Sequence, residues 1–103
     1  MANVKVTYQL PTTRKSGRPL DPADIRHVRI ELSADGGANF APVAQVVPPT
    51  LEYTQTELEP GAWVFRAVVV DTAGRESDPV SGSIDIADET PPGTVQTLTL
   101  ALA

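Results

Sequence analysis

The chain has 103 residues, 41% of them hydrophobic, which suits one domain with a single two-layer core. It contains no cysteine, so a disulfide framework and a thiolate metal site are both excluded. Its formal net charge of −5 excludes a general nucleic-acid binder, because such proteins gain most of their affinity from Lys and Arg side chains that neutralise phosphates.

Short strands separated by turns are the elements that the sequence predicts. Ten prolines and seven glycines are spread along the chain and leave little room for long helices. The first strand covers residues 4–10, where apolar and polar residues alternate. Residues 11–22 then gather proline, glycine, serine and charge, which indicates an exposed loop. The alternation returns over Ile25–Ser33 and predicts a second strand.

The middle of the chain predicts a turn and two less regular strands. Residues 34–39 include two glycines and an asparagine, which tolerate the positive φ angles of a hairpin turn. Residues 40–47 form a weaker strand, and Pro42 places it at a sheet edge because proline lacks the N–H for one ladder hydrogen bond. Residues 51–58 form a short strand that leads into a corner at residues 59–61.

Residues 62–71 predict a long strand with two apolar faces. One face carries the large aromatic side chains and is expected to make the core: Trp63, Phe65, Ala67 and Val69. A free sandwich would expose the other face, so its valines are either a partner surface or ordinary strand-forming residues: Val64, Val68 and Val70. Gly74 then turns the chain, and residues 80–86 alternate again as a further strand.

The end of the chain divides into a linker and an apolar strand. Residues 88–94 are acidic and rich in proline, and such a composition behaves as a linker. Residues 95–103 resume the alternation and predict a strand that needs a sheet to join. Its large apolar residues are Val95, Leu98, Leu100 and Leu102.

Residues 58–79, LEPGAWVFRAVVVDTAGRESDP, resemble the sixth strand and flanking turns of a fibronectin type III domain, a seven-stranded relative of the immunoglobulin sandwich. The matching landmarks are Leu58, Pro60, Gly61, Trp63, Phe65, Ala67, Val69, Asp71, Ala73, Gly74 and Ser77. Upstream, residues 4–11 resemble the family's second strand, with Tyr8 near its usual tryptophan, and the strand around Ile30 resembles its third. Trp63 stands where a corner tyrosine is usual, and an indole lacks the hydroxyl for the tyrosine's hydrogen bond.

The resemblance implies an antiparallel two-sheet β-sandwich of about seven strands, with residues 1–87 forming its body. The family's first strand has no equivalent at the N-terminus, whereas residues 89–100 resemble the opening of such a domain, so the order looks circularly permuted. The C-terminal strand then either folds back to complete its own sandwich or completes that of a neighbouring copy. The second outcome makes a homo-oligomer through strand exchange.

No catalytic, cofactor-binding or metal-binding residue is predicted. His27 is the single histidine and lies on the polar side of its strand, and the aspartates are scattered through turns. The loop at residues 11–22 carries Arg14, Lys15 and Arg18, which either contact an acidic partner or are solvated. Without a phosphate-binding glycine loop or a nucleophile elbow, we expect a protein that is not an enzyme and needs no cofactor.

These features indicate a structural function. A lone, acidic, cysteine-free sandwich of this kind resembles the small immunoglobulin-like proteins of tailed bacteriophage particles, which decorate capsids or form parts of tails. We expect a virion protein, for capsid decoration or for head or tail assembly, whose partners are other virion proteins or copies of itself. Two alternatives stay open: a carbohydrate- or protein-binding adhesion module, and a fragment of a tandem fibronectin type III array.

The expected location follows from the signals that the sequence lacks. The N-terminal residues contain no apolar stretch of the kind found in signal peptides. No segment approaches the roughly 18 apolar residues of a membrane helix. We therefore expect a protein made in a host cytoplasm and incorporated into the virion, with no membrane or nucleic-acid partner.

Overall fold

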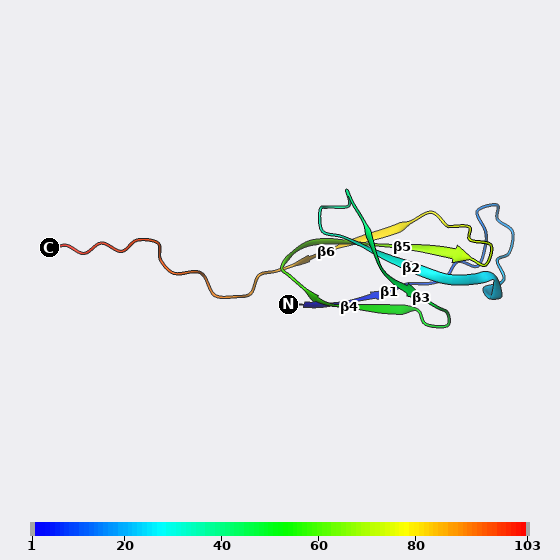
Figure 1. Cartoon of the computed structure of the whole chain (residues 1–103), viewed down its shortest axis with the longest axis horizontal. Coiled ribbons are helices and arrows are strands. Elements are labelled where there is room, and N and C mark those ends of the chain that lie inside the picture. Colours follow the sequence, from blue (N-terminus) through cyan, green and yellow to red (C-terminus); the bar gives the residue numbers. More distant parts are fainter. Residues whose placement is uncertain (1, 103) are drawn as a thin grey trace.

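The computed structural model describes residues 2–102 and shows an all-β protein (Figure 1). The described residues contain no α-helix, and the one helical element among them is a 3-10 turn at Pro22–Asp24. The Asp21 carboxylate caps this turn by accepting a hydrogen bond of 2.9 Å from the Ala23 N–H. The predicted all-β class and its two antiparallel sheets are confirmed.

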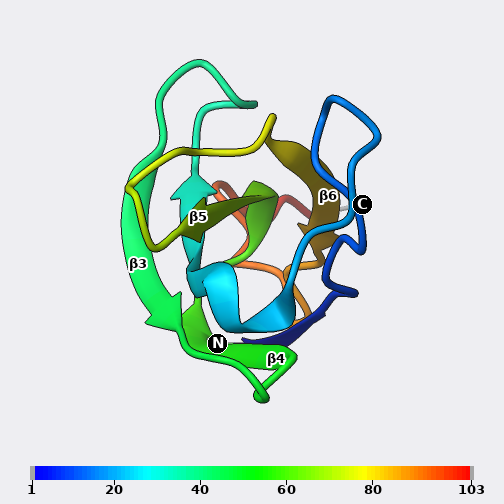
Figure 2. The ribbon, with the colours of Figure 1, turned by 90° about the vertical axis from the view of Figure 1, so that its right-hand side faces the viewer.

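The six strands of the described residues form one sheet of four strands and one of two. The larger sheet has the order β3-β2-β5-β6, with the bounds Ala41–Val46, Ile25–Ser33, Gly61–Asp71 and Val80–Ile86. The smaller sheet pairs β1 with β4, which cover Ala2–Thr7 and Glu52–Leu58. Figure 2 looks along the strands and shows the smaller sheet below the larger one.

The core lies between the two sheets and takes its most buried side chains from β2 and β5. Ile30 of β2 has no exposed surface, and Phe65 of β5 belongs to the same buried cluster. The smaller sheet contributes Leu58, and half-buried side chains complete the cluster. The inward face predicted for the long strand is confirmed, because Trp63 and Val69 pack against this cluster.

Strand bounds follow the period-two patterns, with differences where a pairing partner ends. β1 stops at Thr7 rather than at residue 10, because Thr7 pairs with Glu52, the first residue of β4. β3 lies at the edge of the larger sheet, as Pro42 predicts. The turn before β3 uses Gly36 and Gly37 at φ angles of 76° and 97°, where other residues would be strained.

Trp63 makes a corner hydrogen bond that we did not expect. Its indole N–H donates to the carbonyl of Glu59 at 2.9 Å, four residues upstream. The bond holds the tight connection between β4 and β5, and Gly61, the first residue of β5, adopts a φ of 143°. An indole therefore ties this corner to the strand with its N–H, although it lacks the hydroxyl of a tyrosine.

The outer face of β5 is not the exposed valine surface that the sequence predicts. Val68 and Val70 are only 4% and 5% exposed, and Val64 is half-buried. Val68 pairs with Arg29 of β2 on one side, and Val70 bridges to Glu76 on the other. Arg29 and Glu76 form an ion pair across β5, next to these two valines.

The strand expected at residues 95–103 is not formed by residues 95–102, and Ala103 lies outside the described residues. These residues have no pairing partner among residues 2–102, and a strand exists only as part of a hydrogen-bonded ladder. The segment from Ala87 to Leu102 instead leaves the body as an extended tail (Figure 1). The described chain is consequently long and narrow, with extents of 82 × 24 × 18 Å.

Replacing Ile30 with alanine should destabilise the domain by about 2–5 kcal/mol, because it leaves a cavity at the most buried position of the core. The matched control is Val47→Ala, a truncation at a side chain that is 63% exposed, which should change stability by less than about 0.5 kcal/mol. Urea unfolding followed by tryptophan fluorescence measures both. Equal losses for the two variants would contradict the assigned core.

Candidate functional site

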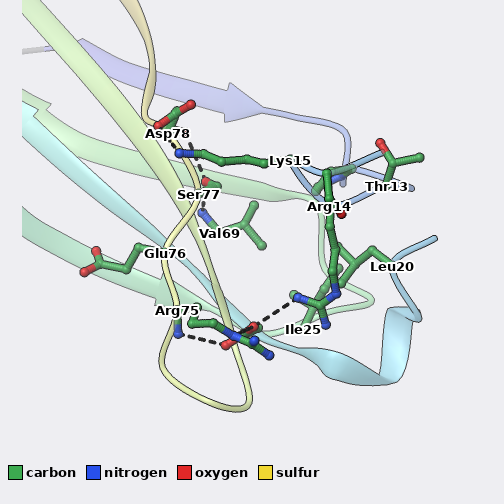
Figure 3. Close-up of a pocket in the computed structure, with 13 residues that line it drawn as sticks. Thr13, Arg14, Lys15, Leu20, Ile25, Val69, Arg75, Glu76, Ser77 and Asp78 are labelled. Atoms are coloured by element: carbon green, nitrogen blue, oxygen red, sulfur yellow. Dashed lines mark hydrogen bonds and ion pairs between the residues drawn. The ribbon is translucent and has the colours of Figure 1, made fainter. Parts of the chain in front are cut away.

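The first candidate site is a cavity at the end of the molecule where loops 11–22 and 72–79 meet (Figure 3). We call it the loop-end pocket; its volume is about 580 Å³. Ile25 and Val69 contribute apolar surface, while Arg14, Lys15 and Asp71 contribute charge. The pocket therefore brings two of the three predicted basic residues together with a carboxylate.

Asp71 is the centre of the loop-end pocket's hydrogen bonding. Its carboxylate accepts bonds from the backbone N–H groups of Ala73 and Arg75 at 3.0 and 2.8 Å. It also accepts from the side chains of Arg75 and Arg14 at 2.8 and 3.2 Å. The Arg75 backbone N–H, together with the two guanidinium groups, lowers the pKa of Asp71 to about 2. Asp71 thus ties the first loop to the turn after β5.

The predicted basic residues are largely occupied within the chain. Arg14 pairs with Asp71 and lies 3.6 Å from Asp24, and Lys15 pairs with Asp78 at 2.7 Å. Arg18 is exposed and forms no ion pair within residues 2–102. The charges of the loop-end pocket are accordingly paired within the chain, and Arg18 lies outside its lining.

The second candidate site lies between the open edges of the two sheets. β1 pairs with β4 on one side only, and β6 pairs with β5 on one side only, within the described residues. Between these two edges is a cavity of about 390 Å³ lined by β1, β5 and β6. We call this cavity the edge groove. It exposes backbone N–H and C=O groups of two strands to any segment that enters it.

The edge groove opens directly onto the core. In β6, Val80, Gly82 and Ile84 lie opposite Ala67, Phe65 and Trp63, so they share the inward face of the larger sheet. Val80 and Ile84 are nevertheless 73% and 39% exposed. Val4, Val6 and Tyr8 line the other side from β1. Side chains that would normally be covered by a neighbouring strand are therefore left in contact with solvent.

The predicted apolar residues of the tail are exposed to solvent. Leu98 and Leu100 are 80% and 86% exposed, and Val95 and Leu102 are exposed as well. At the start of the tail, the Asp88 carboxylate accepts hydrogen bonds from the N–H and the hydroxyl of Thr90, which lower its pKa. The tail thus presents an apolar segment to solvent, separated from β6 by a short linker.

Some predicted residues lie where expected, and several residues of the edge groove were missed. Tyr8, Trp63 and Val69 pack on the core, and Pro60 and Gly74 lie in the turns that flank β5. The predicted sites did not include Val80, Gly82 or Ile84. The signal was present, because Val80, Ile84 and Ile86 are apolar at a spacing of two, but only the pairing with β5 shows which face they share.

Two general searches bear on other kinds of site. Among residues 2–102, no group of three or more His, Cys, Asp or Glu side chains is arranged to hold a metal ion. No helix in this part of the chain has the length and apolar character needed to cross a membrane.

Comparison with known proteins places the chain in no family. No family model, no curated protein and no solved structure matches it. The two candidate sites therefore have to be interpreted from their own residues.

Replacing Asp71 with asparagine should destabilise the domain and flatten the pH dependence of its stability. Because the pKa of Asp71 falls from 3.8 to about 2 on folding, its ionised form stabilises the native state above pH 3.8. That contribution is lost as the pH falls toward 2. The Asn variant should unfold at lower urea concentration near neutral pH and lose less stability than the parent between pH 4 and 2.

Asp78→Asn is the matched control for this experiment. Asp78 is 80% exposed and makes a single ion pair with Lys15, so its removal should leave the acid transition nearly unchanged. Urea midpoints measured at several pH values compare the two variants with the parent chain. An acid transition that Asp71→Asn leaves intact would contradict the role of Asp71 as an ionised anchor.

Proposed function

We propose that the chain is a fibronectin type III-like module that serves as a structural protein of a phage particle and acts through protein–protein contacts. The observation that carries the proposal is the edge groove, where an unpaired strand edge adjoins exposed inward-facing side chains. Such a combination favours strand addition, in which main-chain hydrogen bonds supply affinity and side-chain pockets supply specificity.

The strand order supports the relation to the fibronectin type III family. If β1 corresponds to the family's second strand and β5 to its sixth, the family's first strand would pair with β1 and extend the smaller sheet. Its place would be the edge groove, where residues 2–102 supply no strand. The Trp63 bond to Glu59 also reproduces a link across the corner before the sixth strand.

The assignment to a phage particle rests on analogy with small immunoglobulin-like virion proteins. The acidic charge fits a soluble protein, and the open sheet edge fits one that joins an assembly partner. Capsid decoration and head or tail assembly both require this kind of contact. The partners would be other virion proteins or further copies of this chain.

Phage particles purified from a lysate of the host strain should contain the chain at a constant copy number relative to the major capsid protein. A structural component is incorporated stoichiometrically, so the ratio should not change between independent preparations. Quantitative mass spectrometry of gradient-purified particles measures it, and an abundant host cytoplasmic protein serves as the control for carry-over. Absence of the chain from intact particles would overturn the phage assignment.

A further inference from the structure

We propose that residues 95–102 of one copy occupy the edge groove of the next copy, as a strand antiparallel to β1, and so join copies head to tail. This inference rests on the proposed function, because it names the partner of the same groove. It assigns both the occupant and its direction. Strand direction, side-chain pattern and the composition of the linker support it.

Strand direction favours a neighbouring copy over the chain's own groove. The start of β1 and the end of β6 lie at the same end of the body, and the tail leaves from there in the direction in which β6 runs (Figure 1). β1 runs the opposite way. A tail that continues straight therefore reaches a neighbour's groove already antiparallel to that neighbour's β1. A tail that folded back would have to reverse in the linker and would run parallel to its own β1.

The side-chain pattern of the tail matches the groove. In an extended strand, Leu98, Leu100 and Leu102 point to one side, and the intervening residues point to the other. Residues 94–102 carry no charge, as burial against Val80 and Ile84 requires. The strand would remove the large exposed apolar side chains of the tail and of the groove from water together.

Gly82 leaves room for one of these leucines. It lies on the inward face of β6, opposite Phe65, and no atom lies within 4 Å of the position that its Cβ would occupy. A cavity at this point of the inward face has the form of a hole for a side chain from an added strand. A defined hole also fixes the register of that strand, because a shift by one residue would turn the leucines outward.

The linker favours an extended path away from the body. Residues 88–94 number seven and span at most about 25 Å when fully extended. Pro91 and Pro92 favour an extended polyproline conformation over a sharp reversal. β1 has six residues, and residues 95–102 number eight, so the tail can pair along the whole strand.

The two ends of the body differ in charge. The end that carries the tail is acidic, with Glu57 and Glu59 at the corner and Asp88 and Glu89 in the linker. The opposite end, where an incoming tail would enter, carries exposed Arg18 and Asp21 together with the ion pairs of the loop-end pocket, so basic and acidic groups are mixed there. The contact joins unlike surfaces, so copies related by it form a polar chain that grows from both ends.

Light scattering on the purified full-length chain tests the proposal. The wild type should form species larger than 10.9 kDa whose mass increases with concentration. The donor variant, Leu98→Asp with Leu100→Asp, should be monomeric because its tail cannot enter an apolar groove. Its control, Thr97→Asp with Thr99→Asp, adds the same charge to the opposite face of the strand and should still assemble.

A second variant blocks the groove instead of the tail. Gly82→Phe fills the hole opposite Phe65, and Ser83→Phe adds the same ring to the neighbouring position, whose side chain points to the other face of β6. Gly82→Phe should be monomeric, and Ser83→Phe should assemble. Circular dichroism checks that each body remains folded, as expected because the two leucines are at least 80% exposed and the Gly82 position is open.

Mixing the two monomeric variants separates exchange between copies from folding back. The Gly82→Phe chain has an intact tail, and the donor variant has an intact groove, so together they should form a single 1:1 complex of twice the chain mass. A monomeric wild type, or a mixture that stays monomeric, would overturn the proposal. A wild type that is monomeric alone but present in phage particles would overturn only this inference and leave the proposed function standing.

Discussion

The unpaired edge of β1 is the constraint on which the rest of the structure depends. Every buried backbone N–H and C=O group needs a hydrogen-bond partner, and a two-stranded sheet leaves half of such groups at its outer edges. The four-stranded sheet buries Ile30 on one side and carries the Arg29–Glu76 ion pair across β5. The smaller sheet lacks comparable support within residues 2–102, and the core beside it stays open. Stability and the proposed association therefore involve the same surface.

The two ends of the body have different roles because they are held together differently. At the loop end, Asp71 collects backbone and guanidinium donors and fixes two loops to each other. At the other end, Trp63 fixes the corner before β5, and beyond β6 nothing holds the tail within the described residues. A rigid body with one extended tail is suited to assembly, since the tail could contact a partner without a conformational change in the body.

Much of the fold could be predicted from the sequence, because period-two alternation reports directly which strands exist and which way they face. β2 has its predicted bounds, and Pro42 located an edge. Cross-strand contacts could not be predicted. Val68 is buried beside an ion pair between Arg29 and Glu76, which are far apart in sequence, and Val80 is exposed at an edge without a neighbouring strand among residues 2–102. The tail was recognised as apolar, but the pairing that we propose for it depends on strand direction, which alternation does not encode.

The collinearity of β6 and the tail has a mechanical consequence. A force that pulls on the tail acts along β6, which is held to β5 by antiparallel hydrogen bonds perpendicular to that force. Seven residue pairs, from Gly61 with Ile86 to Ala67 with Val80, then resist the load together in shear instead of opening one after another. The tail therefore continues from a strand over whose whole length a pull along the long axis is distributed. Such an attachment suits a body that transmits load between its two ends.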